Sequence, residues 1–338
     1  MTVPAPSFDH VVAMSTAIGT FEHADHTEPR LAHGYCTDDV ARVLIAVCRE
    51  RAPAPAVTEL ARMALRFLTE AQGPDGSVHN RRSAAGMWED EPSVEDCWGR
   101  SVWAVGTAVR GAPEAPLRQI ATGLFERGIE ARSSWPRAMT FAALGASEVL
   151  QADPGHEGAR LMLADAVDAI GPLGSDSTWP WPEPRLTYAN ATIPQVLIAA
   201  GSLLGRSDVL AQGLELLGWL LDRETVDGHL SPTPVGGAGP QDRMPGFDQQ
   251  PIEAATMADA CAHAAGVTGD ERWLRGLDLA IGWFAGANDA GTVMWDPSTG
   301  GGYDGLHATG PNLNQGAEST LALITTLQHA RSPVASAR

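Results

Sequence analysis

Residues 34–50 read GYCTDDVARVLIAVCRE. A short polar loop with Gly, Tyr and two Asp leads into a run whose apolar residues recur at helical spacing. Similar loops, rich in Trp, Gly, Asp or Asn, precede five further apolar runs. The six loops lie at 31–39, 87–96, 133–137, 179–190, 244–253 and 300–318. Because each helical hairpin buries its apolar face against its neighbours, six units predict an all-α (α/α)6 barrel or toroid. An open helical solenoid is the alternative.

The hydrophobic pattern predicts twelve helices, which would pair into the six hairpins. Their expected ranges are about 8–20, 38–50, 56–72, 95–110, 114–130, 136–151, 157–171, 188–203, 207–222, 251–267, 270–285 and 315–331. The first members of later hairpins are charged on one face, which is typical of an outer helix, and the second members are smaller and more apolar. No linker marks a second domain, so we expect one domain over 1–338 with a frayed tail at 332–338.

The composition excludes several classes of function. Among 338 residues, 41 are acidic and 23 basic, and the formal net charge of −18 disfavours binding to nucleic acid or an anionic membrane. The sequence has no Lys, which excludes a Schiff-base lysine and the usual P-loop lysine. Neither a zinc-type cysteine spacing, nor a signal-peptide pattern, nor an uninterrupted apolar stretch long enough for a membrane span is evident. We therefore expect a cytoplasmic protein without a metal or cofactor, whose oligomeric state the sequence leaves open.

Carboxylates at the loops are the expected catalytic groups. The candidates, each from a different loop, are Asp39, Asp96, Glu183, Asp248 and Glu318. An inverting glycosidase needs an acid and a base roughly 6.5–9.5 Å apart, with room for a water molecule. Glu183 is the favoured acid, because Trp179 and Trp181 would desolvate it and raise its pKa. Asp39 or Asp248 would then be the base.

The same loops supply side chains suited to binding a sugar. Aromatic rings stack on the C–H faces of pyranoses, and amides and charged groups bind the hydroxyls. The candidates are Asp38, Trp88, Arg100, Trp179, Trp181, Tyr188, Asn190, Gln249, Gln250, Asp304, His307, Asn314 and Gln315. Structural alternatives stay open: Asp38 could be a helix cap, and the two Trp of the fourth loop could plug the barrel.

Five strings carry a resemblance to a known family. They are GYCTDDVAR, EDCWGR, WPWPEPRLTYANA, FDQQPIEA and DGLHATGPNLNQGAEST. In this order they resemble a bacterial glycosyltransferase-associated, six-hairpin glycosidase-like family, found alone or fused behind glycosyltransferase-type domains. The resemblance implies an (α/α)6 toroid and a carbohydrate role. Two positions depart from the family pattern, because Val40 stands where Asn is usual and Ala189 where Asp is usual.

Three functions are compatible with these patterns. The first is an inverting glycoside hydrolase, or a phosphorylase, acting on a neutral mannoside or glucan through two loop carboxylates. The second is a sugar epimerase or isomerase on the same barrel, which would use paired bases such as the loop histidines His33, His79, His229 and His307. The third is a non-catalytic glycan-binding or glycosyltransferase-accessory module, which the Val40 and Ala189 departures favour.

Overall fold

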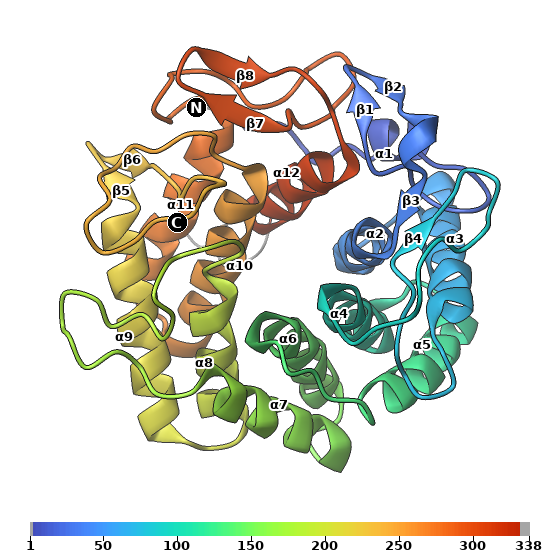
Figure 1. The fold of residues 1–338 in the computed structure, drawn as a ribbon, viewed down its shortest axis with the longest axis horizontal. Helices are drawn as coiled ribbons and strands as arrows, with labels where there is room; N and C mark the ends of the chain where they lie inside the picture. The colour runs from blue at the N-terminus through green and yellow to red at the C-terminus, as the bar shows by residue number, and fades with distance from the viewer. Residues whose placement is uncertain (1–2, 332–338) are drawn as a thin grey trace. The chain divides into compact units, whose positions relative to one another are not determined.

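The computed structural model describes residues 3–331, so the predicted frayed tail at 332–338 lies outside the described residues. Two compact units divide this range. One spans residues 8–170, and the other spans 171–331 together with the N-terminal residues 3–7. Figure 1 shows that both consist mainly of helices joined by loops that carry short strands.

The unit of residues 8–170 consists of three helical hairpins that follow a short first helix. Its helices are α1 (Asp9–Ala13), α2 (Thr37–Arg49), α3 (Pro55–Ala71), α4 (Asp96–Gly111), α5 (Ala115–Gly128), α6 (Pro136–Ala152) and α7 (Glu157–Ile170). Helix α4 packs between α2 and α6, and each of these three is backed by the next helix along the chain. As predicted, α4 is buried along almost its whole length, whereas α5 buries one face.

Glycines allow α4 and α6 to approach closely. A methyl group on Gly145 of α6 would lie 2.3 Å from the carbonyl oxygen of Val102 in α4, and one on Gly106 would lie 2.4 Å from the carbonyl oxygen of Gly145. Real Cβ atoms do not approach backbone oxygens this closely, so the two helices touch backbone to backbone. The small residues seen in the sequence are therefore a packing requirement of this layer.

The second unit repeats the arrangement with five helices. They are α8 (Thr192–Leu203), α9 (Ser207–Arg223), α10 (Pro251–Thr268), α11 (Glu271–Phe284) and α12 (Ala317–Ala330). Helix α10 packs against both α8 and α12, while α9 backs α8 and α11 backs α10. The loops before α10 and α12 are long, and they carry most of the predicted site residues of this unit.

The short strands form two-stranded antiparallel sheets at the ends of helices. In the first unit they are β1 (Ala24–Asp25), β2 (Glu28–Pro29), β3 (Tyr35–Cys36) and β4 (Arg81–Arg82), with a 3-10 turn at Leu31–His33. In the second they are β5 (Thr225–Val226), β6 (His229–Leu230), β7 (Gly305–His307) and β8 (Gly310–Asn312). Asp227 and Gly228 join β5 to β6 with φ values of 48° and 83°. This two-residue turn is the type that the Asp-Gly dipeptide predicts.

Two predicted helix boundaries were wrong. The helix expected over 8–20 ends at Ala13, because the chain turns back there and Ser15 pairs with Thr20. The helix expected from 188 begins at Thr192, because Ala189 adopts a left-handed backbone conformation with φ of 47°. Ala adopts that conformation less readily than Asp or Asn does.

Among residues 3–331, no helix is both long enough and apolar enough to cross a bilayer. Val40 lies in α2 and is fully buried, so its apolar side chain contributes to the core.

Candidate active site

A short antiparallel pairing places Asp248 and His307 side by side. The backbone N–H of Gln249 donates to the carbonyl of Leu306 at 3.0 Å, and that of Leu306 donates back at 2.8 Å. Side chains alternate between faces along a strand, and residues opposite each other share a face. Gln249 and Leu306 therefore share a face on which both are 0% exposed. Asp248 and His307, one position away on each strand, share the opposite face.

The side chains of Asp248 and His307 form a hydrogen-bonded pair that stays accessible to solvent. Nδ1 of His307 contacts Oδ1 of Asp248, and the two side chains are 45% and 46% exposed, respectively. A carboxylate can only accept, so the proton of this bond lies on Nδ1. In the neutral ring, Nε2 then keeps its lone pair. The pair can therefore present a ring nitrogen that takes up a proton, oriented by a carboxylate.

The neighbouring glutamines, both predicted to bind a sugar, differ in their surroundings. Gln249 is fully buried, with its Oε1 accepting from Nε1 of Trp283 at 3.0 Å and its Nε2 donating to Oδ2 of Asp289 at 2.6 Å. Gln250 is half-buried and is the N-terminal cap residue of α10. The amide of Gln249 is thus committed within the protein, whereas Gln250 retains surface beside Asp248.

The two tryptophans of the fourth loop pack onto α9. Trp181 stacks on Trp219 at 6.0 Å between ring centroids, and Trp179 meets Trp219 edge to face at 5.3 Å. Both indole N–H groups donate to Glu183, that of Trp179 to the backbone carbonyl at 3.1 Å and that of Trp181 to Oε2 at 3.3 Å. Trp181 is 2% exposed. Packing inside the protein, the structural alternative for these rings, therefore explains the position of Trp181 without a bound sugar.

Asn190 ties the loop before α8 to α10. Glu253, in the first turn of α10, accepts hydrogen bonds from the backbone N–H of Ala189 and from the backbone and side-chain nitrogens of Asn190, the latter two at 3.2 and 3.1 Å. Oδ1 of Asn190 accepts from the backbone N–H of Thr187 at 3.0 Å. Asn190 is 0% exposed, whereas Tyr188 on the same loop is 38% exposed. The buried amide and carboxylate thus fix the loop that presents Tyr188.

A second buried carboxylate lies near Glu253. Glu224 follows the end of α9 and is 2% exposed, and its Oε1 accepts from the backbone N–H and the hydroxyl of Thr233 at 3.0 and 2.6 Å. Burial, and after it the negative charge of Glu253, raises the pKa of Glu224 to about 8. Glu224 is therefore mostly protonated at neutral pH, and the pattern of the sequence gave no sign of it.

Two residues of the sixth loop hold the loop itself in place. Oδ1 of Asp304 accepts from the backbone N–H of Gly316 at 2.7 Å, directly before α12. Gln315, which is 2% exposed, donates from Nε2 to Oδ2 of Asp296 at 3.2 Å and accepts from the hydroxyl of Thr299 at 2.6 Å. Both side chains, predicted to bind a sugar, thus have structural partners within the loop.

The carboxylates predicted to be catalytic in this unit are all partly exposed. Glu318 lies in the first turn of α12, and Glu183 and Asp248 lie in the fourth and fifth loops. Asn314, in the loop before α12, is also partly exposed. Asp248 is bonded to a group that transfers protons readily, the imidazole of His307.

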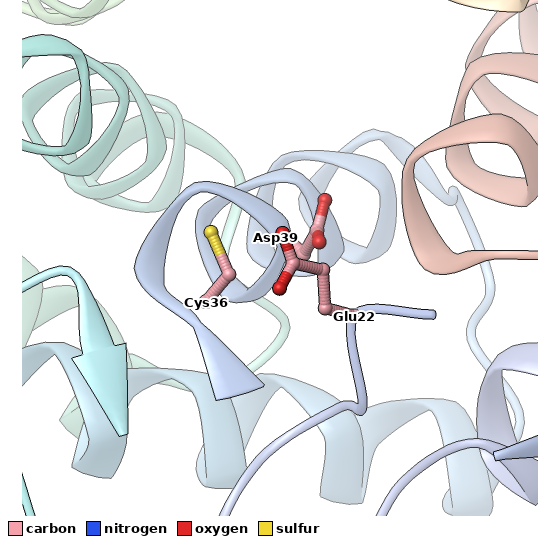
Figure 2. A group of neighbouring side chains, drawn as sticks. All are labelled: Glu22, Cys36 and Asp39. Atoms are coloured by element: carbon pink, nitrogen blue, oxygen red, sulfur yellow. The ribbon is translucent and has the colours of Figure 1, made fainter. Parts of the chain in front are cut away.

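In the first unit, charged groups gather at the start of α2. Figure 2 shows Glu22, Cys36 and Asp39, which offer one ligand-type atom each within 4.8 Å of one another. Burial, followed by the negative charges of Asp38, Asp39 and Glu22, raises the pKa of the Cys36 thiol well above its usual value. The thiol therefore stays protonated, and it donates to Oδ2 of Asp38 at 3.3 Å.

This cluster is poorly suited to a divalent cation. The carboxylate of Asp39 accepts from Arg42 at 2.6 Å, and Glu22 pairs with Arg81. A cation would have to displace these guanidinium groups and to deprotonate Cys36, because the thiolate is the form that binds metals. The charges of the carboxylates are already compensated by arginine, so we assign no metal to this place.

The remaining predicted residues of the first unit lie in the same region of the chain. Nε of Arg100 lies 3.2 Å from Oδ1 of Asp38, and the guanidinium lies 3.9 Å from the ring centroid of Phe141. Trp88 stacks on His79 with ring centroids 5.0 Å apart. The acidic residue Asp96 begins α4 and is half-buried. Arg100 of α4 and Asp38 of α2 are thus brought together from two different helices, which sequence spacing could not predict.

Sequence reasoning missed the partner of the loop histidine His229. Nε2 of His229 donates to Oδ1 of Asp289 at 2.9 Å, although 60 residues separate them. Both lie in the turns at 224–232 and 288–296, which resemble each other in the sequence. The position of His229 in a loop made it a candidate base, whereas the sequence pattern does not single out Asp289. The recurring Asp and Gly in these turns were the available signal.

Comparison with known proteins shows the fold. No family model and no curated protein sequence matches the chain. Among solved structures, the cellobiose 2-epimerase from Bacillus thermoamylovorans B4167 is similar, with a TM-score of 0.70 and 13% identity over 96% of this chain and 95% of that one. A D-mannose isomerase matches with a TM-score of 0.66 and 11% identity, over 96% and 94% of the two chains.

An α-mannanase of family GH76 from Bacteroides thetaiotaomicron has the same architecture. Its TM-score is 0.63 at 11% identity, covering 96% of this chain and 92% of that one. Together with the helical hairpins described above, these matches show that the chain has the all-α (α/α)6 barrel fold that its sequence predicts. The identities are too low for the matches to carry more than the fold.

Proposed function

We propose that the protein is a carbohydrate-active enzyme that isomerises or epimerises the reducing end of a neutral sugar. The pair formed by Asp248 and His307 is the observation that carries the proposal, because it holds an accessible imidazole in one orientation. In this role His307 is the general base, and Asp248 orients it and stabilises the imidazolium that forms.

The proposed chemistry follows from the atoms of this pair. Nε2 of His307 takes the proton from C2 of the open-chain sugar, and the electron pair of the C–H bond forms an enediolate with the C1 carbonyl. Return of the proton to C1, with proton transfer between the two oxygens, gives the ketose. Protonation of the opposite face of C2 by a second donor, while His307 keeps the first proton, gives the epimer. A single base can move a proton from C2 to C1 on one face, so the pair suffices for isomerisation.

Other partly exposed side chains of the same unit are the proposed sugar-binding residues. They are Tyr188, Gln250, Asn314 and Glu318. The buried amides of Gln249, Asn190 and Gln315 are committed to protein partners, so we leave them out of this set. In the first unit, Asp39 and Asp96 stay predicted catalytic carboxylates, and Asp38, Trp88 and Arg100 stay predicted sugar-binding residues. The cytoplasmic location and the association with glycosyltransferases also stay predictions.

Solvent isotope exchange tests the proposal. Free mannose, glucose and cellobiose are incubated with the protein in D2O, and deuterium at C1 and C2 is followed by NMR. We expect incorporation with at least one sugar, accompanied by ketose or epimer, and its loss in the variant His307→Asn. A base that is shielded from solvent can return the original proton and form product without deuterium uptake. The amount of ketose or epimer is therefore measured separately from deuterium uptake. Absence of both, while oligosaccharides are cleaved, would overturn the proposal.

An inverting glycoside hydrolase is the second candidate. The observation in its favour is the accessible carboxylate of Asp248, which could activate water if a second carboxyl group lay roughly 6.5–9.5 Å away. The fold of the α-mannanase is compatible with it. Release of reducing ends from mannosides or β-glucans, lost in Asp248→Asn and kept in His307→Asn, would favour this candidate. Calorimetric binding without turnover of any sugar would instead favour a glycan-binding module.

A further inference from the structure

We propose that Gln249, which is hydrogen-bonded to Asp289 and Trp283, is a positioning residue that sets the geometry of the Asp248–His307 pair. His229 supports Gln249 through its own hydrogen bond to Asp289. The inference rests on the proposed function for the chemical role of the pair. Its structural part is independent of that function. The reasons lie in a chain of contacts on the buried side of the loop.

The first step is the backbone. Gln249 pairs with Leu306 on one side and with Pro234 on the other, so it occupies the middle of a three-stranded piece. The next residue on each side of the Gln249–Leu306 pair is Asp248 and His307. A shift of this pairing by one residue would turn both side chains to the other face. Contacts that fix the register of Gln249 against Leu306 therefore also fix the relative position of Asp248 and His307.

The second step is the buried amide. Gln249 is 0% exposed, so its polar atoms need partners inside the protein. Oε1 accepts from Trp283 at 3.0 Å, and Nε2 donates to Asp289 at 2.6 Å and to the carbonyl of Gly246 at 3.2 Å. The partners come from α11, from the turn that follows it and from the fifth loop. A slipped register would leave these groups unpaired in the interior, so the amide selects one register.

The third step is the charge of Asp289. Its side chain is 6% exposed, and besides Gln249 it accepts from Nε2 of His229, whose side chain is 22% exposed. A buried carboxylate is stable when hydrogen-bond donors surround it, and these two supply donors to its two oxygens. The connected order is therefore His229, Asp289, Gln249 and then, through one peptide unit, Asp248. None of the first three needs to touch substrate.

The variants Asp289→Asn and Gln249→Met test the inference. Each keeps the shape of the side chain while it removes a charge or the amide. The probe is His307 itself, whose ring nitrogens are followed by long-range ¹H–¹⁵N NMR of the full chain. We expect the signature of a proton on Nδ1 in the unaltered protein. In both variants we expect a mixed population of tautomers. For isotope exchange we expect kcat to fall by about 100-fold, with KM changed by less than about 3-fold.

Asp259→Asn is the matched control. It breaks another pair of this kind, because Oδ1 of Asp259 in α10 lies 2.6 Å from Nε2 of His329 in α12, away from the contacts of Gln249. We expect this variant to leave the ring nitrogens of His307 unchanged. Unchanged His307 signals in folded Asp289→Asn and Gln249→Met proteins would overturn the inference. If the unaltered protein catalyses no exchange while the signals do respond, the proposed function fails and the positioning role stands.

Discussion

Nδ1 of His307 donates a hydrogen bond to the carboxylate of Asp248, which lies 59 residues earlier in the chain. The two side chains meet because Gln249 and Leu306 are paired opposite each other, which puts their neighbours on one face. The imidazole is thereby held in one orientation at an accessible place on the loop.

Loss of either partner should lower sugar conversion to different extents. We expect His307→Asn to reduce kcat/KM for isotope exchange by at least about 1,000-fold, because the proton acceptor is gone. Asp248→Asn keeps the base but no longer stabilises its charged form, so a loss of about 100-fold is expected. Circular dichroism and thermal unfolding should match the unaltered protein. Equal and small losses in both variants would contradict the assignment of His307 as base.

Glu224 should make the stability of the protein fall as pH rises. Its folded-state pKa of about 8 exceeds the value of 4.5 for an unperturbed Glu, so folding favours the protonated form. The stabilisation is present in full below pH 4.5 and is lost as pH rises towards 8. We expect this group to lower the free energy of unfolding by roughly 1 kcal/mol per pH unit between about pH 5 and pH 8. Urea denaturation at several pH values measures it.

Glu224→Gln should remove that dependence, because an amide stays neutral and its oxygen can still accept from Thr233. The control is Glu215→Gln, an exposed carboxylate on the same helix α9, which should keep the slope of the unaltered protein. The same slope in all three proteins would show that Glu224 titrates normally in the folded state.

Gly145 and Gly123 should respond in opposite directions to alanine. A methyl group at Gly145 would lie 2.3 Å from a backbone oxygen of α4, whereas at Gly123 in α5 nothing lies within 4 Å. We expect Gly145→Ala to lower the free energy of unfolding by about 2 kcal/mol or more, because two helices must move apart. Gly123→Ala should raise it by roughly 0.5–1 kcal/mol through helix propensity. Chemical denaturation tests both, and a neutral Gly145→Ala would refute the close approach.

Trp181 should act on stability more than on sugar binding. Its ring is 2% exposed and stacks on Trp219, so Trp181→Ala is expected to cost about 3–5 kcal/mol of unfolding free energy. The exposed Trp135, at 59%, is the control, and its replacement should change stability by less than about 0.5 kcal/mol. The sugar affinity of folded Trp181→Ala, measured by calorimetry, should stay within about 3-fold. A selective loss of affinity would restore the sugar-stacking role predicted from the sequence.

The sequence by itself determined the helices and the fold class. The apolar periodicity predicted each of the twelve helices seen in residues 3–331, most within two residues of their ends. The reason is that a helix buried on one face, or on all faces, shows a characteristic local spacing of apolar residues. The two errors have local causes too: a chain reversal at Ser15 and Thr20, and a left-handed Ala189. Turn chemistry of this kind overrides helix propensity without changing the hydrophobic pattern.

The tertiary structure decided which of the polar loop residues can act. Gln249, Asn190 and Gln315 read like sugar ligands in the sequence, yet each is buried and bonded to protein groups. No sequence pattern singles out Asp289, yet it links His229 to Gln249. Hydrogen-bond partners 40 to 64 residues apart have no local signature, because they depend on how separate loops meet rather than on any repeat along the chain.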